Sequence, residues 1–498
     1  MKSIKQTLVS GAMILALSLV FTSCDDILGE WDRPAPVTPT PTPEPEPTPE
    51  PTPTPSKKYR VYTSGTAYTD EPIPAGATAV ESSSADVTWS AGTYVVEGNK
   101  TITGDITLTG DVNLILRDGA ELTINGRING GTRSFNIYGQ EAGTGKLTMD
   151  GSAGTGTLNN ILVQNLQIHG GDITGSNSNW AITTNGTFKI YHGNISATAV
   201  NYGLVTYKDL SIYGGTITAL TTASSATKYA VYVYNAAMEM TGGSLKATST
   251  GADNHGIFVD KDINISGGTV NATGGSSTSG SGGCGIESYG GDITISGTAN
   301  VTATGGDGLT TGGNGIAAAN NSGKTITISG GTVKAIAGNG ITHGIALSTY
   351  NNTGSIKITG GNVTATNGSY GIYSNTIEID GNSTIVNSKG SASGIKATTS
   401  ITFRAGTVTC ESTDNSSNAI DAEFGNIYYH GGTITGAGGT NGFIGSITNN
   451  SGATVTIGNK ASSDAEWSDG TTIADGETKT TYPLGSYMIL PKPATTTP

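Results

Sequence analysis

The sequence predicts an all-β fold, a single right-handed parallel β-helix with a cap at each end. One phrase recurs along most of the chain: an alternating apolar run, a glycine pair and a second alternating run. The second apolar residue of each phrase returns about every 26 residues between Ile168 and Tyr429, and periods of roughly 20–50 residues indicate a solenoid or propeller. The chain holds 75 glycines but only 6% aromatic and 13% charged residues, which suits a narrow stacked core.

Each copy of the phrase predicts a strand, a tight turn and a second strand. The clearest copy spans residues 263–273, and others span 210–219, 326–335 and 356–365. Apolar residues two apart face one side of a strand, and paired glycines allow positive φ at the turn. A second phrase between the copies, a glycine followed by an apolar residue, predicts a third strand. Three strands in about 26 residues fit a parallel β-helix, whereas a WD-type propeller blade needs four strands and about 40 residues.

Residues 1–23 predict a lipoprotein signal peptide. Lys2 and Lys5 precede a hydrophobic run from Leu8 to Phe21 that is too short for a comfortable membrane span. The run ends in Phe-Thr-Ser-Cys, where Cys24 would carry the lipid; the alternative is an ordinary signal peptide with an incidental cysteine. Residues 24–57 then form a linker in which proline nearly alternates with threonine or glutamate, which is typical of polyproline II.

The rest of the chain divides by the presence of the repeat. Residues 58–100 lack the phrase and predict an N-terminal cap, residues 101–460 the β-helix, and residues 461–498 a C-terminal cap and tail. Cys284 and Cys410 lie five repeats apart, on the order of 20 Å along the stack, which is too far for a disulfide. Both are therefore predicted to be free, buried stacking positions.

Charge and motif content narrow the function classes. The net charge of −13 argues against nucleic acid as a partner. Polygalacturonase-type signatures are missing, and Arg404 is the only arginine after Arg133, so a lyase or hydrolase is the less favoured alternative. A lyase would need a cleft in which the long loops 274–283 and 305–313 overhang a carboxylate and a lysine. Asp262 and Asp292 occupy matching positions in successive repeats, with Asp209 two repeats earlier. These aspartates could bind calcium, or they are solvated strand-entry carboxylates; no other cofactor is expected.

Aromatic residues gather in three columns when the repeats are aligned. The residue before the glycine, or the small residue in its place, of the second phrase runs Trp180, Tyr202, Tyr229, His255, Cys284, Asn314, His343, Tyr370. The residue after its apolar position should point outward by alternation and runs Thr183, Val205, Tyr232, Phe258, Glu287, Ala317, Ala346, Tyr373. The third column runs His169, Tyr191, Tyr213. His255 and His343 are expected to cap turns.

Exposed flat rings on a rigid sheet are surfaces on which sugars stack, and exposed apolar patches mark binding sites. The predicted carbohydrate-binding residues are Trp180, Tyr191, Tyr202, Tyr213, Tyr229, Tyr232 and Phe258. In the alternative, the Trp180 column and the pair Tyr232 and Phe258 are internal or corner stacks.

A family resemblance adds to this interpretation. The Ile-x-Ile-x-Gly-Gly-Thr-Val phrase, with the segments 394–403 and 418–421, resembles the carbohydrate-binding β-helix proteins of secreted bacterial systems, which share the pectate-lyase fold. The entry segment 112–148 is similar to β-helical surface proteins of gut bacteria. Asp25-Asp26 after Cys24 resembles the acidic export tag of Bacteroidota-type surface lipoproteins.

The resemblance implies polysaccharide binding, with calcium in some family members, and a lipid-anchored protein on the outer face of the outer membrane. We therefore expect non-catalytic binding of a polysaccharide by a monomer that contacts the membrane only through its anchor. The alternative is a surface adhesin or structural stalk that binds protein, in which case the rings pack internally.

Overall fold

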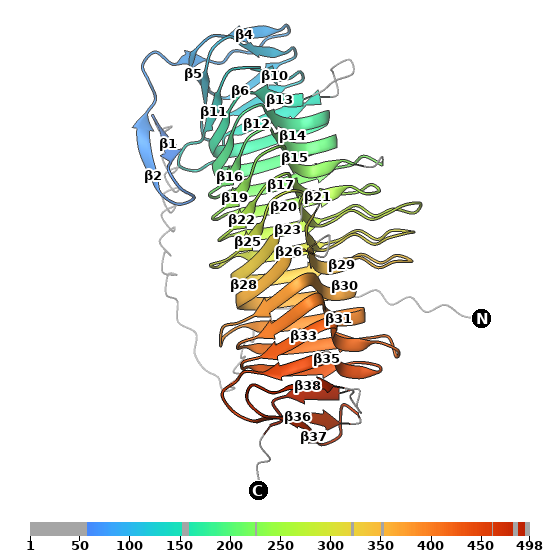
Figure 1. Ribbon diagram of the computed structural model, residues 1–498. Helices are drawn as coiled ribbons and strands as arrows, with labels where there is room; N and C mark the ends of the chain where they lie inside the picture. Colours follow the sequence, from blue (N-terminus) through green and yellow to red (C-terminus); the bar gives the residue numbers. More distant parts are fainter. Residues whose placement is uncertain are drawn as a thin grey trace, which may run out of the picture. The chain divides into compact units, whose positions relative to one another are not determined.

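The computed structural model describes residues 57–151, 159–224, 227–319, 323–349, 353–460, 462–481 and 487–493, all within one compact unit that spans Pro55–Pro498. These residues form β-strands without an α-helix, so none offers a long apolar helix that could cross a membrane. All strands except the first two belong to one 37-stranded sheet, and the all-β prediction is confirmed (Figure 1). Cys24, the signal peptide and nearly all of the linker lie outside the described residues.

The chain winds in coils, and a full coil contributes a strand to each of three faces, which we name A, B and C in chain order. Face A includes β3 (Thr78–Ala79), β5 (Gly92–Val96), β8 (Val112–Leu116), β11 (Phe135–Tyr138), β16 (Leu210–Ile212), β19 (Met238–Met240), β22 (Ile263–Ile265) and β25 (Ile293–Ile295). Face B includes β6 (Asn99–Ile102), β9 (Glu121–Ile124), β12 (Lys146–Asp150), β17 (Thr216–Thr221), β20 (Ser244–Ser249), β23 (Thr269–Thr273), β26 (Asn300–Thr304), β32 (Thr407–Ser412) and β34 (Thr433–Ala437).

Face C carries the third strand of each coil. It includes β4 (Val87–Trp89), β7 (Ile106–Leu108), β10 (Ile128–Asn129), β13 (Asn159–Val163), β18 (Tyr229–Val233), β21 (His255–Val259), β24 (Ile286–Ser288), β27 (Ile316–Ala318) and β29 (Ile345–Thr349). The remaining strands of the coils bend through two or three faces: β14 (Leu166–Thr184), β15 (Phe188–Thr206), β28 (Thr325–Ile336), β30 (Ser355–Ile379), β31 (Ile385–Phe403), β33 (Asn418–Tyr429) and β35 (Asn441–Asn449).

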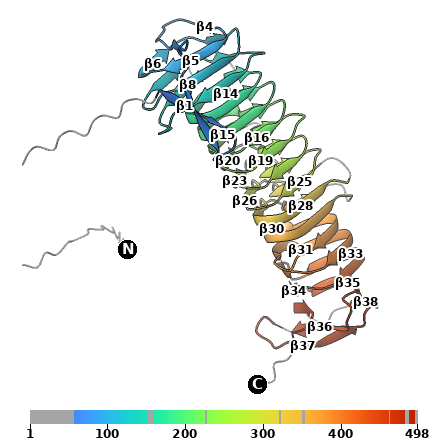
Figure 2. The same ribbon diagram turned by 90° about the vertical axis from the view of Figure 1, so that its left-hand side faces the viewer.

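Strands of one face pair in parallel with their equivalents in the next coil, and like residues stack on like. The predicted markers align in register as Ile168, Ile190, Ile212, Met240, Ile265, Ile295, Ile328 and Ile358. These side chains are fully buried, and each contributes roughly 2 kcal/mol of apolar burial. Figure 2 shows the resulting column of coils in chain order. The predicted repeat period is therefore confirmed.

The glycine pair makes the turn between faces A and B. Gly215 and Gly268 have φ of 82° and 78°, in the left-handed region that glycine adopts without strain. A Cβ at Gly268 would also lie 2.6 Å from the carbonyl oxygen of Gly243 in the previous coil. Both conformation and stacking distance therefore require glycine at this position.

One repeat in the expected alignment is wrong by two residues. Leu347, not Ile345, stacks on Ile316, and Ile345 pairs with Tyr370. Ser348, not Ala346, therefore belongs to the outward column, and His343 lies outside the Tyr370 column. The Gly-Ile pair at this coil sits at the end of a loop, and the fully buried position goes to Leu347, two places later.

The two ends differ from the expected boundaries. Parallel stacking already includes β3, β4, β5 and the start of β6 within the segment 58–100 that was expected to form a cap. Only the antiparallel hairpin of β1 (Lys58–Tyr62) and β2 (Tyr68–Pro72) stands apart from the sheet, and β1 lies beside β11 and β14.

At the other end, four strands pair antiparallel and cover the last coil edges: β36 (Val455–Lys460), β37 (Ser468–Ile473), β38 (Thr478–Thr481) and β39 (Tyr487–Leu490). Covered edges cannot pair with another chain.

Candidate functional site

The largest aromatic assembly lies on face C, across five successive coils. We name it the face-C cluster, and its members are Trp180, Tyr202, Tyr207, Tyr229, Tyr232, Tyr234, His255, Phe258 and Tyr289. Strand register explains the gathering, because Trp180, Tyr202, Tyr229 and His255 occupy one column and Val205, Tyr232 and Phe258 occupy another.

The two columns merge because their rings lean over one another. The rings of Tyr229 and Phe258 are stacked 4.5 Å apart at 5°, although they come from different columns. Tyr202 likewise stacks on Tyr232 at 5.9 Å. Val205 and Phe258 are consequently buried, Phe258 at 8% exposed, and the expectation of an open stripe at Val205, Tyr232 and Phe258 is wrong. Alternation sets where the Cα–Cβ bond points, but longer neighbouring side chains cover these positions.

The open edge of the cluster comes from residues that the sequence analysis did not select. Tyr234 and Tyr289 are 40% and 46% exposed, and each rests on a ring nearer the sheet. They stand two residues beyond Tyr232 and Glu287, so continuing the outward alternation past the strand end would have found both.

Burial sets the protonation of the cluster. Desolvation first, and then the neighbouring Asp260 charge, raise the pKa of Tyr232, and desolvation chiefly raises the pKa of Tyr229 and Tyr202. These phenols therefore stay neutral at physiological pH. The Tyr202 hydroxyl donates to the Thr227 carbonyl at 3.4 Å, and the Lys228 ammonium lies 5.4 Å from the Tyr202 ring centroid.

Two of the predicted sugar-binding residues belong to a second assembly. Tyr138, His169, Tyr191 and Tyr213 stack nearly face to face at 4.7, 4.6 and 4.9 Å, and we name them the ring ladder. The structure thus separates Tyr191 and Tyr213 from Trp180, Tyr202, Tyr229, Tyr232 and Phe258.

The hairpin β1–β2 packs against the ring ladder and buries His169. The Tyr62 N–H donates to His169 Nδ1 at 3.0 Å, and the Tyr62 ring stacks on His192 at 4.6 Å. At the hairpin turn, Gly65 packs against the backbone of Tyr213. Burial lowers the pKa of His169 to about 4, so its imidazole is neutral and accepts this hydrogen bond.

The predicted cation-binding aspartates are exposed and support the next coil. Asp262 Oδ1 accepts a hydrogen bond from the Asp292 N–H at 2.9 Å, and Asp292 Oδ1 accepts one from the Thr325 N–H at 2.9 Å. Asp209 Oδ1 accepts one from the Ala237 N–H at 3.1 Å. This arrangement fits the alternative interpretation, in which they are strand-entry carboxylates.

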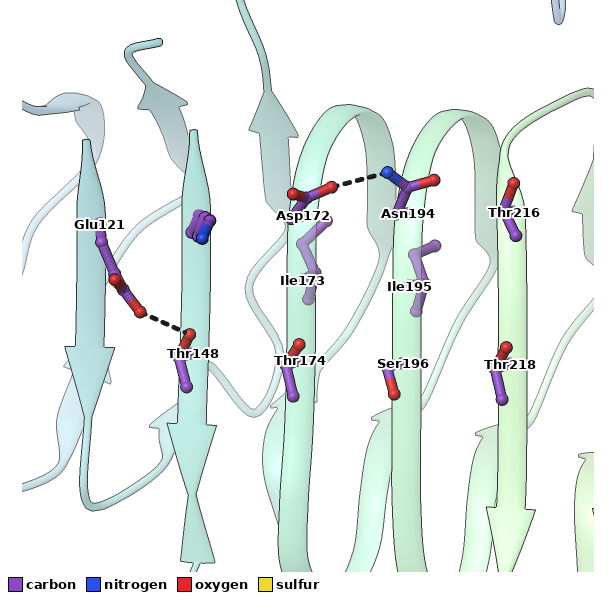
Figure 3. Close-up of a pocket in the computed structure, with 11 residues that line it drawn as sticks. Glu121, Thr148, Asp172, Ile173, Thr174, Asn194, Ile195, Ser196, Thr216 and Thr218 are labelled. Atoms are coloured by element: carbon purple, nitrogen blue, oxygen red, sulfur yellow. Dashed lines mark hydrogen bonds between the residues drawn. The ribbon is translucent and has the colours of Figure 1, made fainter. Parts of the chain in front are cut away.

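A shallow polar groove of about 490 Å³ lies on face B (Figure 3). Strand register puts Lys146 between Glu121 and Asp172, and Glu121 accepts a hydrogen bond from Thr148 while Asp172 accepts one from Asn194. Carboxylates and a lysine thus share this groove. The loops 274–283 and 305–313, which a lyase was expected to use, instead bind each other, for example through the Ser277 N–H and the Asp307 carbonyl at 2.8 Å.

At the edge of the face-C cluster, its member His255 meets Cys284 and Glu287, which brings a nitrogen, a sulfur and an oxygen within 4.8 Å of one another. Burial lowers the pKa of His255 to about 4 and raises the pKa of Glu287 to about 7. The 3.2 Å contact between these two side chains is therefore not a stable ion pair at neutral pH. The sequence shows the column that contains His255 and Cys284 and the column that contains Glu287. That the three side chains meet follows only from the pairing of adjacent coils.

Cys284 and Cys410 are both free and buried, as predicted. No protein-family model, no curated protein and no solved structure matches the chain. The proposed function is therefore based on the surfaces of the chain itself.

Proposed function

We propose that the chain is a right-handed parallel β-helix that binds a polysaccharide on the face-C cluster and does not cleave it. The observation that supports this most is a band of rings across five coils that ends in two exposed tyrosines, Tyr234 and Tyr289. Parallel pairing of every coil with the next supports the β-helix, whose handedness follows from the usual crossover rule.

Geometry and charge narrow the ligand class. Coils about 4.8 Å apart hold the rings at fixed spacing, so little side-chain freedom is lost on binding. Neutral phenols supply hydroxyl donors beside apolar ring faces, which is the combination that a sugar presents in return. The net charge of −13 disfavours polyanions. A neutral polysaccharide is therefore the proposed ligand.

The anchor and the location belong to the same proposal. Cys24 would carry the lipid, the proline-rich linker would hold the coils away from the outer membrane, and the protein would act as a cell-surface monomer. Incorporation of a labelled fatty acid in the producing cell, lost in Cys24→Ser, tests the anchor. Cleavage by external protease of intact cells tests surface exposure.

Affinity electrophoresis against a panel of neutral and acidic polysaccharides, with and without calcium, tests the function. Tyr234→Ala/Tyr289→Ala removes the two exposed rings, and Tyr68→Ala removes a comparably exposed ring on the hairpin as a matched control. We expect one neutral glycan to retard the chain and the Tyr68→Ala variant, but not the double variant. If the double variant is still retarded, the glycan binds elsewhere on the chain. If no glycan retards the parent chain, the protein-binding adhesin is favoured.

The face-B groove supports a second candidate, a polysaccharide lyase, because Lys146 stands between two carboxylates there. A lyase would release unsaturated products that absorb in the ultraviolet from an acidic polysaccharide, and Lys146→Ala would abolish them. Absence of such products across the panel would remove this candidate.

A further inference from the structure

Strand register brings three metal-ligand types together at one place on face C. His255 begins β21, and Cys284 stands at the matching position one coil later, because Ile257 pairs with Ile286. Glu287 follows Ile286 and turns back toward the same position. His255 Nδ1 lies 3.2 Å from Glu287 Oε2, and all three ligand atoms lie within 4.8 Å of one another.

The three side chains are held in place by burial. Cys284 is 5% exposed and Glu287 is 8% exposed, while the His255 side chain keeps a small opening to solvent. The polar partners of the Glu287 carboxylate are the His255 imidazole and the Cys284 thiol. Burying a carboxylate and a thiol beside an imidazole is costly unless a cation or protons balance them. The packing therefore holds the three side chains together inside the fold rather than on a flexible surface.

The ligand types select the metal. Imidazole nitrogen, thiolate sulfur and carboxylate oxygen together suit zinc, whereas calcium takes oxygen ligands only. Bonds of about 2.0–2.3 Å place tetrahedral ligands roughly 3.3–3.8 Å apart, so a side-chain shift on the order of 1 Å would complete the site. Three protein ligands leave a fourth position toward the solvent opening at His255.

Surrounding groups could orient the ligands. Burial chiefly raises the pKa of the Cys284 thiol, and the Asn314 backbone N–H, which donates to its sulfur, acts in the opposite direction. The Cys284 N–H donates to His255 Nδ1 at 3.2 Å, so a metal at that nitrogen would replace this hydrogen bond. The His255 ring also packs against Tyr229 and Phe258, at 5.4 and 5.3 Å between centroids.

We propose that His255, Cys284 and Glu287 bind a zinc-type divalent cation, with one coordination position open beside the face-C cluster. One ligand, His255, is a buried member of the face-C cluster, but none of the three is an exposed ring, so metal binding can be tested separately from glycan binding.

Cobalt(II) alone, added to the metal-stripped chain, is the probe, because a cobalt–thiolate bond gives a near-ultraviolet charge-transfer band and tetrahedral cobalt gives intense visible bands. Cys24 is replaced by serine throughout, so that only Cys284 and Cys410 remain as thiols. We expect one equivalent of cobalt to produce the bands, zinc to abolish them and calcium to leave them unchanged.

Variants locate the site. Cys284→Ser should remove the charge-transfer band, and Cys410→Ser, which alters the other buried thiol, should keep it. Glu287→Gln is nearly isosteric and should lower cobalt affinity by at least the roughly hundredfold that loss of an outer-shell partner can cost. Circular dichroism of each variant confirms folding, and Glu287→Gln decides the matter if Cys284→Ser does not fold. No thiolate band in the folded parent chain, or a band that depends on Cys410, overturns the proposal.

Discussion

The ring ladder and the face-C cluster are built from the same kind of residue on neighbouring coils, yet only the cluster ends in exposed rings, and the ladder has one ring, His169, that is buried. In the ladder, equivalent rings stack nearly parallel, and the hairpin closes over His169 through Tyr62. In the cluster, rings from two columns interleave at mixed angles, and Tyr234 and Tyr289 remain exposed. A column of aromatics in a coiled repeat is therefore not by itself a binding surface, because a distant segment decides whether it is covered.

The largest expected effect is a pH dependence of the hairpin. Burial holds the pKa of His169 at about 4 against an ordinary 6.5, and opening the hairpin would move it toward the ordinary value. The open state therefore binds a proton below pH 6.5 while the closed state does not until about pH 4. The contribution of this group to keeping the hairpin closed is fully present above pH 6.5 and falls by at most about 3 kcal/mol as the pH drops to 4.

Burial also lowers the pKa of His192, which acts in the same direction, whereas Tyr138 and Tyr191 have raised pKa values and do not titrate in this range. Hydrogen exchange of the Tyr62 amide, corrected for the intrinsic rate, measures the opening. A core amide such as that of Ile212 serves as the control. Protection of Tyr62 that does not change between pH 7 and pH 4 would contradict the covered ladder.

His169→Ala should affect the ring ladder without affecting the face-C cluster. The substitution removes two ring contacts and the acceptor for the Tyr62 N–H, which should cost about 2 kcal/mol of hairpin stability. Limited proteolysis within residues 58–72 reports the loosening. Glycan retardation should stay unchanged. If it is lost, the ladder and not the face-C cluster contributes the binding rings.

Tyr289→Ala should show the opposite pattern. The ring is 46% exposed, so the free energy of unfolding should change by less than about 0.5 kcal/mol. Glycan affinity should fall by about 1 kcal/mol, roughly fivefold, because a stacking ring is lost. Comparison of thermal melts with affinity electrophoresis measures both. A large loss of stability would mean that Tyr289 supports the core rather than forming a surface.

Lys228→Ala is expected to have the smallest effect. Its ammonium lies 5.4 Å from the Tyr202 ring centroid, a contact that contributes about 0.5 kcal/mol at a partly exposed position. Glycan affinity should change about twofold, and Lys228→Arg should restore it. A loss greater than about tenfold would show that the ligand is acidic and bound through charge, against the proposed neutral polysaccharide.

Much of the fold could be predicted because it repeats. The markers from Ile168 to Ile358 were found from spacing alone, and the structure aligns them in register. The glycine pair in the repeated phrase predicted a turn at Gly268. The structure gives the reason, because the positive φ and the close approach of the neighbouring backbone both exclude a side chain there. The slip at Ile345 shows the limit of a motif, since strand register there places Leu347, two residues beyond the Gly-Ile pair, in the buried column.

The candidate site was predicted only in part. Trp180, Tyr202, Tyr229, Tyr232 and Phe258 do meet on one face, because strand register brings their columns side by side. Their exposure could not be read from alternation, which gives a direction and not the reach of neighbouring rings.

By itself, the sequence determined the repeat, the inward columns, the turn glycines and the free state of the two cysteines. These follow from two-residue alternation and from the need to bury apolar side chains in every coil. Only the tertiary structure decided that Tyr62 covers His169 across 107 residues of chain, that Tyr234 and Tyr289 stay open, and that His255, Cys284 and Glu287 meet. Accessibility and ligand geometry depend on which distant segments and long side chains share a position in space, and no local pattern records that.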